Sequence, residues 1–254
     1  MESTKSLYDF PEAYDLAFSY RNYESEVDFV LSLFSGKMPK NALEVAAGPA
    51  SHGLQLAQRG LEVEGLDLST QMAQYATKVF SENGLKINYH LADMVRFSLD
   101  KKYDLIINMV DSVSHIHELN DLKLHLAAVS NHLSKGGLYV VEAAHPKSLD
   151  LVDTTMSEWT MGKEDFNVTF KWMALDTPSS LHQSYNALVS MKIVRNGKTS
   201  VVSETFNARV HTLEDFAESV GGGLSLKHVY GNFEKAPLDD EKSWRMILVF
   251  ERVN

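Results

Sequence analysis

A loop of small residues and an acidic residue beyond it are the first features that could carry chemistry. Residues 46–53 read AAGPASHG and follow a strand-like run, a setting in which a loop lets a ligand approach the backbone. Asp67 ends the next strand-like run, 19 residues after Gly48, where a carboxylate can accept both hydroxyls of an adenosine ribose. The loop alone would fit an ordinary turn, but the pair predicts an adenosine-containing cofactor.

Two further features flank later strands. Asp93 and Met94 follow the third predicted strand; the Asp93 carboxylate could accept from an adenine amino group while the next backbone N–H donates to the ring. Capping a helix is the alternative role of Asp93. Residues 133–137 read LSKGG and predict a turn directly before a buried strand at 138–143.

The densest cluster of potential acid–base groups follows the fourth predicted strand and includes Asp111, His115 and His117. A hydroxyl group that acts as a nucleophile needs a base to take its proton, and His115 or Asp111 is the first candidate for that base. An amine nucleophile needs only to arrive in its neutral form. His145, after the fifth strand, is a second candidate at the same edge. Alternatively, Asp111 and Ser112 cap a helix and His117 is exposed. No ligand pair has the helical spacing of a metalloenzyme, so we expect no metal.

Apolar runs of strand length alternate with helix-period segments from residue 40 to 141, which predicts a parallel sheet wrapped by helices. The expected strands are residues 42–46, 61–66, 87–91, 103–109 and 138–143, and the expected helices are residues 14–34, 53–59, 69–83 and 119–133. Ligands in such sheets gather beyond the carboxyl ends of the strands. The candidate residues above all follow strands and should therefore meet at one edge.

The sequence pattern changes after residue 146, where long stretches of alternating apolar and polar residues are rich in Val, Thr and aromatic residues. Three antiparallel strands are expected at 166–175, 183–194 and 199–210, with a tight hairpin at Asn196-Gly197. Beyond them we expect a helix from Thr212 to Val220 and strands at 224–230 and 245–250 that return to the first sheet.

The amino-acid composition limits the classes of molecule that the protein can bind. The formal net charge is −10, which is unfavourable for binding a polyanionic backbone, so we expect no nucleic acid as substrate. The absence of cysteine removes thiol nucleophiles, disulfides and zinc–thiolate sites. The N-terminus does not read as a signal peptide and no apolar run reaches membrane-spanning length. We therefore expect a cytoplasmic protein that does not associate with membranes. The sequence leaves open whether the protein forms a homodimer.

In order and spacing these motifs resemble those of the class I S-adenosylmethionine-dependent methyltransferases. Residues 43–50 match their first motif, 65–69 the ribose motif, 92–94 the adenine motif and 133–137 their L-x-P-G-G turn. Ala50 replaces the usual second glycine and Lys135 the usual proline. The N-terminal segment and the β-rich insertion resemble a small-molecule subgroup that includes sugar-amine and glycine N-methyltransferases.

The resemblance implies an α/β fold with a Rossmann-like seven-stranded sheet, helices on both faces and an inserted antiparallel β subdomain. It divides the chain into an N-terminal helical lid (1–39), an S-adenosylmethionine-binding core (40–149), a β insertion that covers the acceptor (150–210) and a segment that completes the sheet (211–254). Four aromatic side chains of the insertion either line the acceptor pocket or form the core of the small sheet: Trp159, Phe170, Trp172 and Tyr185.

The resemblance also assigns cofactor-binding residues. Glu44 would receive the ammonium group of the cofactor, beside Gly48, and Arg21 on the lid would pair its carboxylate. Arg21 could instead be a solvated helix residue, and Tyr14 could simply pack. The implied cofactor contacts are Tyr14, Arg21, Glu44, Ala46, Gly48, Asp67, Leu68, Asp93, Met94 and Met109.

The sequence therefore predicts methyl transfer from S-adenosylmethionine to a nitrogen or oxygen of a small-molecule acceptor. One alternative is a nicotinamide-dependent oxidoreductase, which would explain the loop and Asp67 but neither the Asp93 motif nor the turn at 133–137. The other is a protein that binds the cofactor without catalysis.

Overall fold

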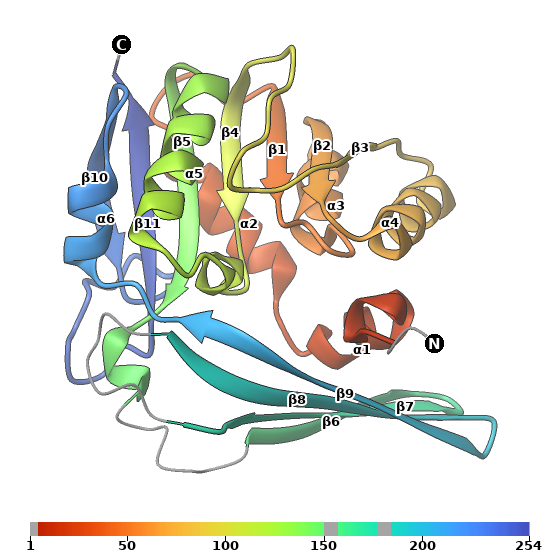
Figure 1. The fold of residues 1–254 in the computed structure, drawn as a ribbon. Helices are drawn as coiled ribbons and strands as arrows, with labels where there is room; N and C mark the ends of the chain where they lie inside the picture. Colours follow the sequence, from red (N-terminus) through yellow and green to blue (C-terminus); the bar gives the residue numbers. More distant parts are fainter. Residues whose placement is uncertain (1–4, 150–156, 177–183, 254) are drawn as a thin grey trace.

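The computed structural model describes residues 5–149, 157–176 and 184–253, which form two sheets. The larger sheet has seven strands in the order β10-β11-β5-β4-β1-β2-β3. Its parallel strands are β1 (Asn41–Val45), β2 (Glu62–Asp67), β3 (Asn88–Leu91), β4 (Tyr103–Asn108) and β5 (Leu133–Ala144). Figure 1 shows their carboxyl ends directed toward the second, four-stranded sheet. The expected meeting edge thus lies between the two sheets.

The last two strands, β10 (Leu224–Tyr230) and β11 (Arg245–Arg252), complete the larger sheet as predicted. β11 runs antiparallel to β5, with Arg245 opposite Ala144. This pairing places the start of β11 beside the carboxyl end of β5. Residues near position 245 therefore lie at the same edge as the candidate site.

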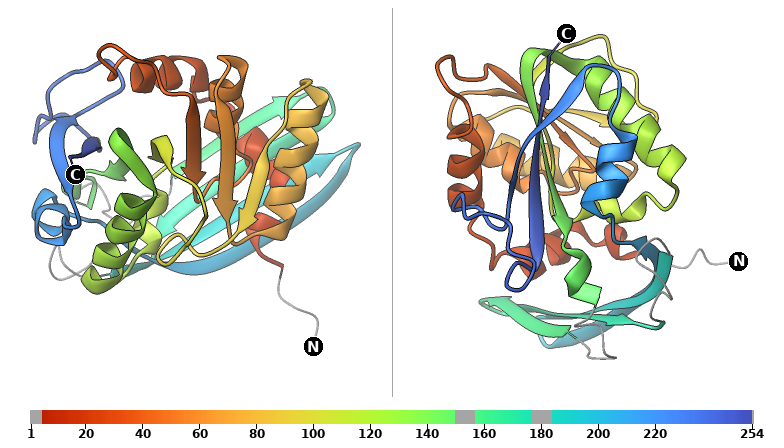
Figure 2. Two further views of the ribbon diagram at one scale, coloured as in Figure 1. Left: turned by 90° about the horizontal axis from the view of Figure 1, so that it is seen from above. Right: turned by 90° about the vertical axis from the view of Figure 1, so that its left-hand side faces the viewer.

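Helices cover both faces of the larger sheet (Figure 2). α2 (Tyr23–Leu31), α3 (Ser51–Gln58) and α4 (Thr70–Glu82) pack on one face, and α5 (Leu119–His132) and α6 (Leu213–Ser219) on the other. Central strands are buried on both faces: Leu105 and Ile107 of β4 face the first group of helices, whereas Ile106 faces the second. Such two-sided burial explains why these strands read as continuous apolar runs.

Capping residues and glycines determine where the helices begin and end. Ser69 caps α4 by accepting from the Met72 amide, and Gly84 follows the helix with a φ of +70°, a conformation that glycine adopts without a Cβ penalty. Thr212 and Asp215 form a capping box at the start of α6. Within the described parts of the chain, no helix is long and apolar enough to cross a membrane.

The four-stranded sheet is antiparallel and contains β6 (Ser157–Lys163), β7 (Phe166–Ala174), β8 (Ser184–Arg195) and β9 (Lys198–Arg209), in that order. The β8–β9 hairpin turns at Asn196 and Gly197, both with positive φ, as their pairing predicts. β6 was missed by the sequence reasoning because its run is short and mostly exposed, with only Trp159 and Met161 partly buried. The sheet packs against α1 (Pro11–Phe18), and the Trp159 indole N–H donates to the Ala17 carbonyl over 2.7 Å.

Two predictions of local structure were wrong. The single helix expected at 14–34 is broken between α1 and α2, because Asn22 caps the second helix by accepting from the Ser25 amide. The turn expected at 133–137 is part of β5: Leu133 already pairs with Tyr103, and the pairing resumes at Leu138 opposite Leu105. The intervening residues therefore form a bulge within the strand rather than a turn before it.

Candidate functional site

The loop after β1 has an unusual backbone. Ala46, Gly48 and Ala50 all have positive φ, between +51° and +56°. A Cβ on Gly48 would meet no atom within 4 Å, so the loop faces open space at this point. Ala50 accepts the left-handed conformation without glycine, at a cost of about 1 kcal/mol. The departure from the usual motif thus leaves the loop geometry in place.

Asp67 and this loop are joined directly. The Asp67 Oδ2 atom accepts from the Gly48 amide over 2.9 Å, and Oδ1 accepts from the Ser69 amide over 2.9 Å. Leu68, beside Asp67, is 74% exposed. Both carboxylate oxygens are oriented by backbone donors and retain lone pairs for further hydroxyl donors.

Asp93 and Met94 follow the neighbouring strand. The Ala92 amide donates to the Asp67 carbonyl over 3.1 Å, which brings the two loops together. Asp93 Oδ1 accepts from the Val95 amide over 2.8 Å, so its carboxylate shapes a local turn rather than capping a helix. Asp93 and Asp67 thus lie at adjacent strand ends, as an adenosine site requires.

The N-terminal segment lies over the loops. The Tyr8 and Tyr14 rings are 5.7 Å apart, and the Ser69 hydroxyl donates to the Tyr8 carbonyl over 3.4 Å. Burial, with a contribution from the nearby Asp67 carboxylate, raises the pKa of both phenols above the ordinary value. Tyr14 therefore lies near Asp67, and Tyr8, which the sequence analysis missed, lies beside it.

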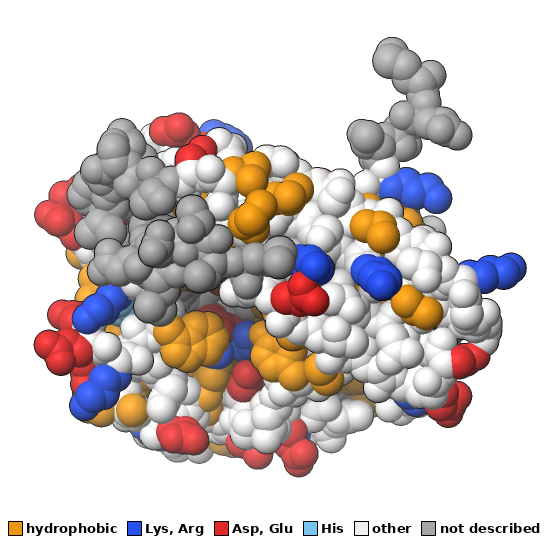
Figure 3. Space-filling view, turned by 90° about the horizontal axis from the view of Figure 1, so that it is seen from below, with side chains coloured by type: hydrophobic (Ala, Val, Ile, Leu, Met, Phe, Trp, Pro, Cys, Tyr) orange, Lys and Arg blue, Asp and Glu red, His pale blue; other side chains and the backbone are white. Residues whose placement is uncertain are grey.

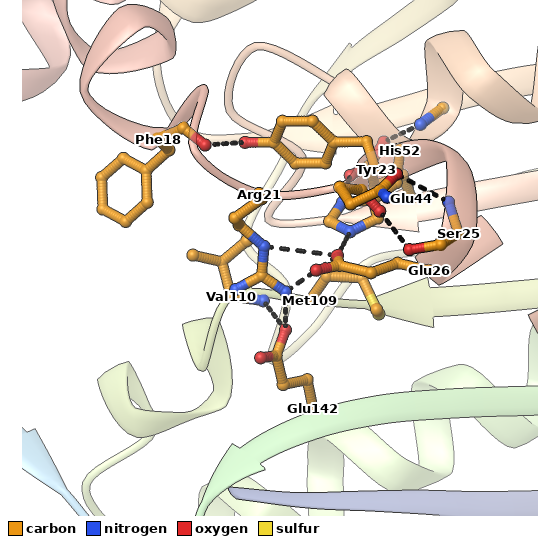
Figure 4. A network of polar contacts seen from close by, with 12 residues as sticks. Phe18, Arg21, Tyr23, Ser25, Glu26, Glu44, His52, Met109, Val110 and Glu142 are labelled. Atoms are coloured by element: carbon orange, nitrogen blue, oxygen red, sulfur yellow. Dashed lines mark hydrogen bonds and ion pairs between the residues drawn. The ribbon is translucent and has the colours of Figure 1, made fainter. Parts of the chain in front are cut away.

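Arg21 lies in the break between α1 and α2 and is not solvated. Its guanidinium contacts Glu26 at 2.9 Å and Glu142 at 2.7 Å, and its side chain is 5% exposed (Figure 4). Glu142 also accepts from the Val110 amide over 2.8 Å and from Arg245 over 2.7 Å. Sequence reasoning missed Glu142, although a lone acidic residue inside the apolar run VVEAA was the available signal.

Glu44 belongs to the same buried cluster. Its Oε2 atom accepts from the Gly53 amide over 2.7 Å, so the carboxylate ties the end of β1 to α3. A Cβ on Gly53 would lie 2.8 Å from that oxygen, so a larger residue there would displace the Glu44 carboxylate. Met109, a predicted cofactor contact, is buried in the hydrophobic core that includes residues of α2, α3 and α4.

Asp111 lies at the carboxyl end of β4 on a strained backbone, since Val110 and Asp111 both have positive φ. Its side chain does not cap the following short helix η2 (Ser112–His115) but accepts from the Ala144 amide over 2.8 Å. Burial, together with the nearby negative charge of Glu142, raises the pKa of Asp111 to about 7. The group can therefore exchange a proton near neutral pH.

The three histidines of this region differ. His115 is exposed, its Nε2 atom is 3.4 Å from the Tyr8 hydroxyl, and its ring lies 5.2 Å from Phe206. Partial desolvation lowers the pKa of His115. By contrast, His117 contacts the Asn207 carbonyl, and both ring nitrogens of His145 are engaged, with the Lys147 amide and the Asp240 carboxylate. This arrangement favours Asp111 and His115 as acid–base groups over His145.

The four aromatic side chains of the insertion divide into two pairs. Trp159 and Phe170 pack with α1 in a shared core. Trp172 and Tyr185 are 6.1 Å apart in a second cluster, and the charge of Asp111 contributes to raising the pKa of Tyr185. The second pair therefore faces the Asp111 side of the site.

An approach to this edge is visible from below, where apolar side chains border a hollow that contains acidic and basic groups (Figure 3). Tyr20 and Trp244 are 54% and 56% exposed. The Arg245 guanidinium stacks 3.6 Å from the Trp244 ring and contacts Glu142. Among the described residues, no group of three or more acidic or histidine side chains is arranged to hold a metal ion.

The sequence is similar to those of known methyltransferases. Residues 42–137 match a family model described as a methyltransferase domain. The chain is 29% identical to dTDP-3-amino-3,4,6-trideoxy-alpha-D-glucopyranose N,N-dimethyltransferase of Streptomyces venezuelae, over 53% of this chain and 56% of that protein. It is 24% identical to a glycine/sarcosine/dimethylglycine N-methyltransferase of Actinopolyspora halophila, over 87% of this chain and 38% of that protein. The matches thus span about half or less of these relatives.

Solved structures share the fold. A methyltransferase from Clostridium acetobutylicum superposes with a TM-score of 0.80 at 21% identity, covering 96% of this chain and 98% of that one. Streptomyces venezuelae DesVI superposes with a TM-score of 0.79 at 21% identity, covering 94% and 97%. Both the seven-stranded sheet and the added antiparallel sheet therefore belong to a known architecture.

Proposed function

We propose that the protein is a class I S-adenosylmethionine-dependent methyltransferase that methylates a nitrogen of a small-molecule amine. The match of residues 42–137 to a methyltransferase domain supports this proposal. The observation that carries the proposal is the Asp67 carboxylate, held by the Gly48 and Ser69 amides beside a loop that faces open space. The carboxylate can accept hydrogen bonds from both hydroxyl groups of an adenosine ribose. The match favours methyl transfer over the nicotinamide alternative.

The buried charges fit the methionine end of the cofactor. Glu44 offers a desolvated carboxylate to an ammonium group, and Arg21 offers remaining N–H donors to a carboxylate. Asp93 and Met94 border the adenine side. When bound, S-adenosylmethionine supplies a methyl group on a sulfonium, which an in-line nucleophile can displace without a strong catalyst.

The acceptor is proposed to enter between the two sheets, past Tyr20 and Trp244, toward Asp111. An amine is nucleophilic only when neutral, and after gaining a methyl group its nitrogen must lose a proton. Asp111, with a pKa near 7, and His115, which favours its neutral form, can each accept that proton. Tyr185 and Trp172 border the same space, so the insertion would select the acceptor.

Two named relatives act on amines: one on an amino sugar nucleotide, the other on glycine and its methylated forms. Both support nitrogen over oxygen as the acceptor atom. The experiment is a turnover screen that follows S-adenosylhomocysteine formation across amino sugars, amino acids, phenols and carboxylates. Turnover confined to amines supports the proposal, whereas turnover confined to phenols or carboxylates contradicts it.

A further inference from the structure

His52 occupies a place that the proposed chemistry does not yet use. Its ring is 1% exposed on α3 and lies between two carboxylates from different elements. Nε2 is 2.7 Å from Glu26 Oε2, and Nδ1 is 3.5 Å from Glu44 Oε1 (Figure 4). The imidazole therefore connects the N-terminal segment to the carboxylate assigned to the cofactor's ammonium group.

Every element packed around this ring contributes an identifiable group. α2 presents Glu26 and the edge of Tyr23, whose ring centroid is 4.9 Å away. β1 presents Glu44, and β2 presents the apolar Val63 to the first turn of α3. Beyond Glu26 lies the guanidinium of Arg21. The two carboxylates are thus the groups that decide the charge of His52.

The charges of the surrounding cluster are unequal without a proton on this histidine. The cluster contains three carboxylates and two guanidinium groups, from Glu26, Glu44, Glu142, Arg21 and Arg245. A protonated His52 makes the buried charges balance, which a low-dielectric environment strongly favours. Burial by itself would lower the pKa of His52, but the hydrogen bonds to Glu26 and Glu44 outweigh it and raise that pKa.

We propose that His52 is a positioning residue that holds Glu44 for the cofactor's ammonium group and releases its proton to solvent when that group binds. The inference rests on the proposed function. An arriving ammonium takes the place of the imidazolium as the positive partner of Glu44, and the repulsion between the two neighbouring cations disfavours the protonated ring. The cofactor's own carboxylate pairs with Arg21, on the far side of Glu26, and offsets this repulsion only in part. The neutral ring still bonds to Glu26 through one N–H.

Calorimetry on the intact protein tests the coupling without turnover. S-adenosylhomocysteine, which carries the same ammonium group and cannot react, is titrated in buffers of different ionisation enthalpy at several pH values. We expect release of up to about one proton per ligand bound, and an affinity that rises with pH by up to ~10-fold per pH unit while His52 is protonated in the free protein.

His52→Gln is the matched variant, because it keeps polar contacts but cannot carry a proton. It should bind more weakly than wild-type protein at high pH, where the neutral His52 still positions Glu44, and both the proton release and the pH dependence should be lost. His90→Gln is the control: His90 pairs with Glu64 at the other edge of the sheet and its loss should leave proton release unchanged.

The outcomes separate the inference from its premise. Binding by the wild-type protein without proton release, or unchanged release in His52→Gln, would overturn the role of His52 and leave the cofactor assignment intact. No binding of either cofactor form by folded wild-type protein would instead remove the proposed function. Because the proton count on wild-type protein needs no variant, the test holds even if His52→Gln does not fold.

Discussion

Arg21, in the break between the first two helices, lies 2.7 Å from Glu142 near the end of β5. This contact joins the N-terminal segment to the strand that ends beside the proposed acceptor. Glu142 receives Arg245 through its other oxygen, so one buried carboxylate connects three parts of the chain that are distant in sequence. The site consequently depends on a contact that also holds the fold together.

Glu142→Gln should destabilise the protein by about 3 kcal/mol or more, because it leaves buried guanidinium groups without their shared anion. Chemical denaturation at pH 7 measures the effect. Glu158→Gln is the control, since the Glu158–Lys171 pair is largely exposed and its loss should change the free energy of unfolding by at most about 0.5 kcal/mol. Equal effects of the two variants would argue against a structural role for the Arg21–Glu142 contact.

Gly48→Val should abolish tight cofactor binding, because the branched side chain would fill the open space at the loop. Its φ of +51° also adds strain of about 1–3 kcal/mol. Gly84→Val is a close control: Gly84 has a φ of +70° and equally open surroundings, but lies at the end of α4. Both variants should lose comparable stability in thermal melts, and only Gly48→Val should lose affinity in calorimetry. Equal affinities would show that the loop is only a turn.

Asp111→Asn should lower kcat by about 10²-fold or more if the carboxylate accepts the acceptor's proton. Since burial raises the pKa of Asp111 to about 7, the wild-type group is an active base only above that pH. The kcat of the wild-type protein should therefore rise with pH through about 7, and the variant should lose this step. Asp121, which is partly exposed and paired with Arg96, supplies a control in Asp121→Asn. An unchanged pH profile in Asp111→Asn would exclude this role.

Much of the fold was readable because each element carries its own local signal. The strand ends that hold Gly48, Asp67 and Asp93 lie together as predicted, since parallel strands present their carboxyl ends at one edge. The Asn196-Gly197 hairpin followed from the conformations these residues allow. These features depend on short-range chemistry.

Features that depend on pairing across the fold could not be read in this way. Nothing near Arg21 in the sequence indicates that Glu142, 121 residues away, would neutralise it. The sequence alone therefore allowed the alternative that Arg21 is a solvated helix residue. The four-stranded sheet was expected to cover the acceptor. That Trp159 of this sheet packs in one hydrophobic core with α1 was not predicted. The Leu133–Gly137 segment looked like a turn because a bulge and a turn use the same glycines.

The central claim is that the Asp67 carboxylate binds the cofactor's ribose, and calorimetric titration of wild-type protein and Asp67→Ala tests it most directly. Wild-type protein should bind S-adenosylmethionine and S-adenosylhomocysteine but not NAD. Folded Asp67→Ala should bind both more weakly by about 1–3 kcal/mol, the cost of unpaired hydroxyl groups. Binding of NAD alone, or an affinity for S-adenosylhomocysteine that Asp67→Ala leaves unchanged, would contradict the account.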